Sequence, residues 1–216
     1  MPDVLSVRHE AGVCHLVLNR PERRNALSGE LRRALVDQLS AAAADEAVGV
    51  VVLSGAGQHF CAGFDLKELA GASDPGQVFV DAGPYHHAVH TFPKPLIAAV
   101  VGSAVAGGMD LALMCDLRVA GPTAVFGQPQ VRHGLPALHE LVTAVVGDPM
   151  ARDLCLTGRL VDATEALRIG LVQRLVDGDP VRVALEVAAD IAAGPDPVAA
   201  KRPFLAGQPE MSAPSD

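Results

Sequence analysis

Two glycine-containing turns constrain this chain more than any other feature of its sequence. They are residues 60–66 (FCAGFDL) and 105–111 (VAGGMDL). Each follows an apolar, strand-like stretch, residues 50–53 at some distance and residues 96–101, and each leads into a predicted helix. A helix start leaves backbone N–H groups free, and glycine lets the backbone turn sharply and approach a ligand closely. Singly, each turn fits a plain strand-to-helix connection, but two such donors that converge can form an oxyanion hole.

The rest of the sequence alternates between predicted strands and helices. Ser28 is a predicted N-cap for a helix that carries Leu31, Ala34, Leu35 and Leu39 on one face. Strands are expected at 4–7, 13–18, 48–53, 96–101, 117–120, 124–126 and 171–176, and helices at 111–115, 138–146, 164–169 and 181–193. Short helices in an irregular segment are expected at 67–95. This order predicts a layered α/β core with right-handed crossovers.

Length and composition favour one core domain. A chain of 216 residues can bury one substantial core, and with 3% aromatic residues that core must consist mainly of Ala, Val and Leu. We therefore expect a core domain at residues 1–193. Residues 194–216 are rich in Pro, Gly, Ala and Ser, and are expected to form a short, flexible C-terminal tail.

Charge and cysteine usage exclude several classes of partner. The formal net charge of −8 argues against nucleic-acid binding, which needs clustered Lys and Arg. No apolar run reaches membrane-spanning length, so no membrane partner is expected. The four cysteines are widely spaced, which predicts reduced thiols in a cytoplasmic protein. No metal site and no redox cofactor are predicted.

Ordered motifs along most of the chain resemble the crotonase family, also called the enoyl-CoA hydratase/isomerase superfamily. They are 18–21 (LNRP), 25–27 (NAL), 60–66, 94–100 (KPLIAAV), Gly107-Gly108, 114–118 (MCDLR), 126–129 (FGQP), 156–158 (LTG) and 166–172. The resemblance implies a spiral core of ββα units with flanking helices, here with a shortened C-terminal helical region. It also implies an acyl-CoA thioester as substrate, with coenzyme A entering only as part of that substrate, and a homotrimer or hexamer.

The resemblance also implies roles for individual residues. The backbone N–H groups of Phe64 and Gly107 would hold the thioester oxygen and stabilise an enolate. Coenzyme A would be contacted by Arg23, Arg24, Ala26, Ala62, Phe64, Asp65 and Leu66. The two arginines are candidates for its phosphates, although solvated charge ahead of a helix is an equally good interpretation. Asp65 is expected to brace its turn.

The chain departs from the family at the acid/base positions. Hydratases of this family use two glutamates, but the two positions here hold Asp110 and Gln130. A Gln side chain neither takes nor gives a proton at neutral pH, so Asp110 is the surviving candidate acid/base. Glu140, or His139 beside it, could substitute, or Glu140 could simply favour a helix N-terminus.

Three histidines, His86, His87 and His90, lie in the region that borders the acyl pocket in related proteins. They are candidate acid/base groups or a solvated surface.

The resulting hypothesis is an enzyme of acyl-CoA thioesters, an enoyl-CoA hydratase or isomerase that acts through an enolate in an oxyanion hole. The alternative is a catalytically silent acyl-CoA binding protein that has lost its second carboxylate.

Overall fold

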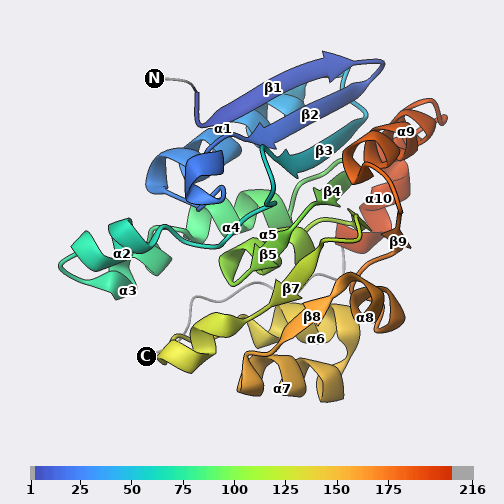
Figure 1. The fold of residues 1–216 in the computed structure, drawn as a ribbon. Coiled ribbons are helices and arrows are strands. Elements are labelled where there is room, and N and C mark those ends of the chain that lie inside the picture. The colour runs from blue at the N-terminus through green and yellow to red at the C-terminus, as the bar shows by residue number, and fades with distance from the viewer. Residues whose placement is uncertain (1–2, 206–216) are drawn as a thin grey trace.

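The computed structural model describes residues 3–205, and its centre is a six-stranded sheet (Figure 1). The strand order is β1 (Leu5–Glu10), β2 (Val13–Leu18), β3 (Val50–Gly55), β4 (Leu96–Val100), β6 (Leu117–Ala120), β9 (Arg174–Leu175). β1 and β2 form an antiparallel hairpin, and every later pair is parallel. Helical crossovers between parallel strands are the α/β pattern that the sequence predicts.

A smaller sheet lies below the first one in Figure 1 and contains β5 (Ser103–Val105), β7 (Val125–Gly127) and β8 (Leu160–Asp162). β5 pairs with β7 in parallel, and β7 pairs with β8 antiparallel. The chain moves from the large sheet to the small one between β4 and β5. The second glycine turn therefore follows β5 and not β4.

Helices surround both sheets. They are η1 (Pro21–Arg23), α1 (Gly29–Ala44), α2 (Leu66–Gly71), α3 (Pro75–Val80), α4 (Gly83–His90), α5 (Gly107–Leu113), η2 (Pro129–His133), α6 (His139–Val146), α7 (Asp148–Thr157), α8 (Ala163–Arg168), α9 (Pro180–Ala192) and α10 (Pro197–Leu205). The Ser28 hydroxyl accepts a hydrogen bond from Leu31 N at 3.3 Å, so the predicted cap of α1 is confirmed.

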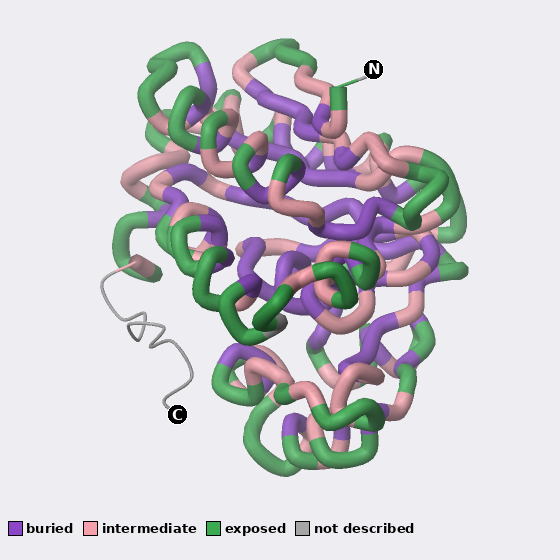
Figure 2. Tube along the Cα trace, turned by 90° about the vertical axis from the view of Figure 1, so that its left-hand side faces the viewer, coloured by how far each residue is buried: buried purple, intermediate pink, exposed green. Residues whose placement is uncertain are grey.

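The large sheet buries apolar side chains on both faces. On one face, Val50, Val52 and Ile97 pack with the buried side of α9. On the other, Val51 and Leu53 belong to the main core, which also contains the buried face of α1. Figure 2 shows the sheet region as the buried centre of the molecule. Covered parallel strands explain why β3 and β4 are apolar without alternation.

The C-terminal segment requires a correction. Residues 197–205, expected to belong to a flexible tail, form α10, and Lys201 on this helix is only 4% exposed. Its ammonium lies 2.8 Å from Asp116 Oδ2 and donates to Lys94 O at 3.0 Å. This ion pair, with a buried Lys201 and a partly exposed Asp116, holds α10 on the core despite the proline-rich composition. Residues 206–216 of the expected tail lie outside the described residues.

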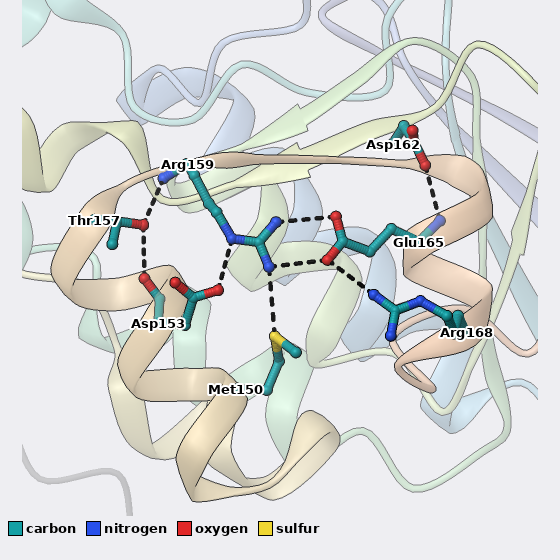
Figure 3. Close-up of polar contacts among 7 residues, drawn as sticks. All are labelled: Met150, Asp153, Thr157, Arg159, Asp162, Glu165 and Arg168. Carbon is teal, nitrogen blue, oxygen red and sulfur yellow. Dashed lines mark hydrogen bonds and ion pairs between the residues drawn. The ribbon is translucent and has the colours of Figure 1, made fainter.

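Residues 148–162, where no element was predicted, form α7 and β8. Arg159 connects this region: its guanidinium lies 2.6 Å from Asp153 on α7 and 2.9 Å from Glu165 on α8 (Figure 3). The contact to Glu165 is bidentate. One arginine therefore links two helices across the turn that leads into β8.

Candidate active site

The two glycine turns lie side by side because a short parallel pairing precedes them. Cys61 forms a bridge with Ala104, in which Cys61 N donates to Ser103 O at 3.0 Å and Val105 N donates to Cys61 O at 3.1 Å. Phe64 and Gly107 each lie three residues beyond this pairing. Because the two segments run in parallel and have equal length, Phe64 and Gly107 lie at corresponding positions of neighbouring backbone segments.

Glycine is required where the turns touch. A Cβ on Gly108 would lie 2.1 Å from Cys61 O, and one on Gly107 would lie 2.9 Å from the Phe64 ring. Gly63 has a φ of +92°, and a Cβ there would lie 3.0 Å from Gly107 N. These contacts leave no room for side chains between the turns. The amides predicted to act together are thus in neighbouring backbone segments.

The Phe64 amide faces away from its β partner. Leu27 N donates to Gly63 O at 2.8 Å and Asp65 N donates to Leu27 O, so this bridge uses the groups on either side of Phe64. Gly107 is the first residue of α5, where a backbone N–H has no partner within the helix. Within residues 3–205, neither amide donates to a protein acceptor. Both remain available to a ligand oxygen.

Backbone strain marks the second turn. Ala106, which precedes Gly107, has φ 51° and ψ −130°, a conformation that side-chain-bearing residues rarely adopt. Its N–H donates to Gly127 O on β7 at 2.9 Å. Such strained residues persist where surrounding structure fixes them, and they concentrate at functional sites.

Asp65 braces the first turn, as predicted. Its carboxylate caps α2 by accepting from Lys67 N at 3.0 Å, and it pairs with Arg20 Nη2 at 2.8 Å. Burial alone would raise the pKa of Asp65, but these two partners outweigh burial and lower it. Arg20 also donates to Ala26 O. One arginine therefore ties the loop before α1 to the turn that carries the Phe64 amide.

Asp110 lies in the second glycine turn, residues 105–111, and is almost completely buried. Gln128 Nε2 donates to Asp110 Oδ1 at 2.7 Å, and Gln130 Nε2 donates to Gln128 Oε1 at 2.7 Å. Burial raises the pKa of Asp110 to about 7, against the opposing effect of the Gln128 hydrogen bond. A carboxyl group with this pKa can both accept and release a proton near neutral pH.

Gln128 is a site residue that the sequence analysis missed. It is fully buried and separates the predicted Asp110 from the predicted Gln130. The only signal was its position between Gly127 and Pro129 at the end of a strand, where a buried amide needs a polar partner. In the described residues Gln130 has no hydrogen bond to Asp110, and Gln128 links the two side chains.

Glu140 and His139 stand apart from this chain of hydrogen bonds. Both are exposed in the first turn of α6. Within the described part of the protein, no hydrogen bond connects either side chain to Asp110, Gln128 or Gln130. A role for Glu140 in catalysis stays a prediction.

The predicted coenzyme A contacts come from two segments that meet at the first turn. Ala62 N donates to Arg24 O at 3.0 Å, next to the Leu27–Phe64 bridge. The arginine side chains and Leu66 are exposed, whereas Ala26 and Asp65 are buried. Arg23, Arg24, Ala26, Ala62, Phe64, Asp65 and Leu66 thus gather on adjacent backbone segments. The exposed arginines fit the charge of phosphates.

Among the α4 histidines, His86 lies nearest the first turn. Its ring centroid is 6.2 Å from that of Phe64, in an edge-on arrangement. Burial, together with the charge of Arg32, lowers the pKa of His86 to about 4. His86 is therefore neutral at physiological pH, while His87 is exposed.

Comparison with known proteins agrees with this geometry. The sequence profile of the family described as enoyl-CoA hydratase/isomerase matches residues 8–206. A protein of Rhizobium meliloti named "Probable enoyl-CoA hydratase" is 43% identical over 181 residues, which are 82% of this chain and 70% of the relative. A 2,3-dehydroadipyl-CoA hydratase of Escherichia coli is 38% identical over 194 residues, 87% of this chain and 75% of the relative.

A solved structure of an enoyl-CoA hydratase/isomerase from Xanthobacter autotrophicus is also similar. It matches with a TM-score of 0.87 and 36% identity, and covers 94% of this chain and 79% of that protein. The chain therefore belongs to the enoyl-CoA hydratase/isomerase family of the crotonase superfamily. Its fold and its general function, of the enoyl-CoA hydratase/isomerase type, are as the sequence predicted. In residues 3–205, no helix has the length and apolarity needed to span a bilayer.

Proposed function

We propose that this protein moves a proton on an enoyl-CoA thioester, with the amides of Phe64 and Gly107 as an oxyanion hole and Asp110 as the proton carrier. The observation that carries this proposal is the buried Asp110 carboxyl on α5, the helix that begins at Gly107, where Gln128 donates a hydrogen bond to it. Preorganised N–H donors stabilise charge that develops on the thioester oxygen. Coenzyme A enters with the substrate, its phosphates near Arg23 and Arg24.

Isomerisation is the reaction that a single carboxylate performs most directly. Asp110 removes a proton from the α carbon of a 3-enoyl thioester, and the electron pair of the broken C–H bond forms the enolate. Asp110 then returns that proton to the γ carbon as the double bond moves to the α,β position. No water is consumed, and one group that both accepts and donates a proton is sufficient.

Hydration requires a group that orients a water molecule as well. Gln130 Oε1 is buried without a hydrogen-bond partner in the described structure, and an amide oxygen can accept a hydrogen bond from water. Gln130 would then position water while Asp110 transfers its proton. We place this activity second because an amide cannot take the proton itself.

Substrate assays with Asp110→Asn separate these functions. Asn keeps an acceptor for Gln128, but its amide does not gain or lose a proton near neutral pH. Turnover should therefore fall by about 100- to 10,000-fold. We expect the wild type to convert 3-enoyl thioesters faster than it hydrates 2-enoyl thioesters. Turnover that survives Asp110→Asn unchanged would exclude Asp110 as proton carrier. Tight acyl-CoA binding without any turnover would instead identify a silent binding protein.

The cytoplasmic location and the homotrimeric or hexameric assembly are further parts of the proposal. Free cysteines at all four positions fit a reducing compartment. Exposed leucines on α7, β8 and α8 supply an apolar surface that a second copy could cover.

A further inference from the structure

Helix α4 carries an unusual set of buried polar atoms. Four of the five buried side-chain atoms without a hydrogen-bond partner in the described residues belong to it: Tyr85 Oη, His86 Nε2, His90 Nδ1 and His90 Nε2. Buried polar groups are normally paired, and each exception calls for an explanation. Their concentration on one helix indicates that this helix faces something able to form hydrogen bonds.

Two of these groups lie beside the proposed reaction site. The Tyr85 side chain is 2% exposed, and its ring centroid is 5.0 Å from that of His86. The His86 ring in turn lies 6.2 Å from the ring of Phe64, whose amide is the first oxyanion donor. The Phe79 ring also packs on the Phe64 ring, with a centroid distance of 5.0 Å. His86 thus lies next to the ring of the residue that carries the first proposed oxyanion donor, and Tyr85 lies next to His86.

Both side chains of this pair are uncharged near neutral pH. Burial raises the pKa of Tyr85 well above its usual value, and the Cys61 and Asp110 side chains add to this effect. The phenol therefore stays protonated, and His86 stays neutral. The pair offers uncharged donors and acceptors to a ligand.

The chemistry of this pair excludes a charged partner. The positive charge of Arg32 acts on His86, and its guanidinium lies over the Phe64 ring at 5.0 Å. It is occupied by Glu68 at 2.8 Å and by Leu27 O at 2.8 Å. A carboxylate bound at Tyr85 and His86 would thus meet an arginine that is already paired, whereas a hydroxyl or keto oxygen needs only hydrogen bonds.

We propose that Tyr85 and His86 form a recognition site for an uncharged oxygen on the acyl chain, so that the protein prefers hydroxyacyl- or oxoacyl-CoA thioesters over plain alkyl ones. This inference rests on the proposed acyl-CoA function. An acyl chain that leaves both polar atoms unpaired loses the corresponding hydrogen bonds, which is how polar sites discriminate against apolar analogues.

Calorimetric titration with saturated thioesters tests the preference without turnover. The probes are hexanoyl-CoA, its derivatives with a hydroxyl group on C4, C5 or C6, and adipoyl-CoA, which carries a carboxylate. We expect one hydroxylated probe to bind at least 10-fold more tightly than hexanoyl-CoA. Equal binding of all probes, or tightest binding of adipoyl-CoA, would overturn the inference and leave the acyl-CoA function intact. If no thioester binds, the proposed function itself fails.

Variants assign the preference to named side chains. Tyr85→Phe and His86→Leu should each reduce the preference about 10-fold while hexanoyl-CoA binds as before. His87→Leu, an exposed histidine on the same helix, should keep the full preference. Because the Tyr85 hydroxyl has no protein partner, Tyr85→Phe should not lower the melting temperature of the free protein. A preference unchanged in both Tyr85→Phe and His86→Leu would assign the recognition elsewhere and contradict the proposal.

Discussion

At the scale of single residues, the site depends on one carboxyl group that is hard to ionise. Asp110 is buried in α5, and Gln128 is its hydrogen-bond partner. The sequence identified Asp110 and Gln130 because both stand at positions of a recognisable pattern. It included Gln128 only within the 126–129 motif and gave it no role, because its contact with Asp110 depends on how the small sheet packs against α5 and not on local sequence.

The pH dependence of turnover should report the ionisation of Asp110. A base must be deprotonated to remove a proton, and burial raises the pKa of Asp110 to about 7. The rate should therefore increase as the pH rises through about 7 and level off above it. A pH profile of kcat/KM measures this, because kcat/KM reports the ionisation of the free enzyme. A flat profile between pH 6 and 8 would contradict the assignment.

The same residue should make the fold less stable as the pH rises. Its pKa is higher in the folded state than the ordinary value of 3.8, so the folded state binds more protons between about pH 4 and 7. The free energy of unfolding contributed by Asp110 falls across this range. Asp110→Asn should thus stabilise the protein above pH 7 by ~1–4 kcal/mol, since one pKa unit corresponds to about 1.4 kcal/mol.

Urea unfolding at pH 4 and pH 8 measures that change. The stabilisation should be small at pH 4 and largest at pH 8. Asp37→Asn, at an exposed position of α1, is the matched control and should change neither value. An Asp110→Asn variant that is less stable than the wild type at pH 8 would show that the carboxylate is stabilised by contacts stronger than its burial.

At the scale of elements, local sequence predicted most helices and strands but failed where tertiary contacts decide. The Ser28 cap and the apolar face of α1 were readable because they are local patterns. α10 was not, because it contains Pro203 and lies in a proline-rich segment. Its helix is kept by the Lys201–Asp116 pair, which a composition argument cannot foresee.

Removal of the Lys201 charge should release α10. Lys201→Met leaves Asp116 without its cation and also removes the contact of the ammonium with the Phe92 ring at 5.7 Å. Because Asp116 is 28% exposed and keeps its hydrogen bond from Leu96 N, the free energy of unfolding should fall by about 1–3 kcal/mol. Arg202→Met, at the exposed neighbouring position, should cost less than about 0.5 kcal/mol. Chemical denaturation compares the two, and equal effects would contradict a specific role for Lys201.

At the scale of the whole molecule, the two sheets have different roles. The large sheet separates two clusters of the apolar core, one on each face, and the small sheet adjoins α5. The apolar runs of β3 and β4 made the large sheet predictable. The small sheet was not recognised as a unit, because its strands have three residues each and carry no periodic pattern.

An exposed apolar surface supports the proposed assembly. Leu156 is 79% exposed, Leu160 54% and Leu167 43%, on α7, β8 and α8. We expect a trimer or hexamer by light scattering, and Leu156→Glu should shift it toward the monomer, because a carboxylate is costly to bury. Leu66→Glu, on an exposed leucine outside this surface, is the control. A wild type that is monomeric at all concentrations would contradict the proposal.

The two proposed oxyanion donors, the amides of Phe64 and Gly107, each lie three residues beyond one shared pairing, that of Cys61 with Ala104. The two amides therefore lie next to each other only while both connecting segments have the same number of residues. Amino acids in these turns can therefore change over evolutionary time wherever space allows, but insertions and deletions there should be purged. The geometry of the proposed site therefore depends more on the lengths of these two segments than on their amino-acid composition.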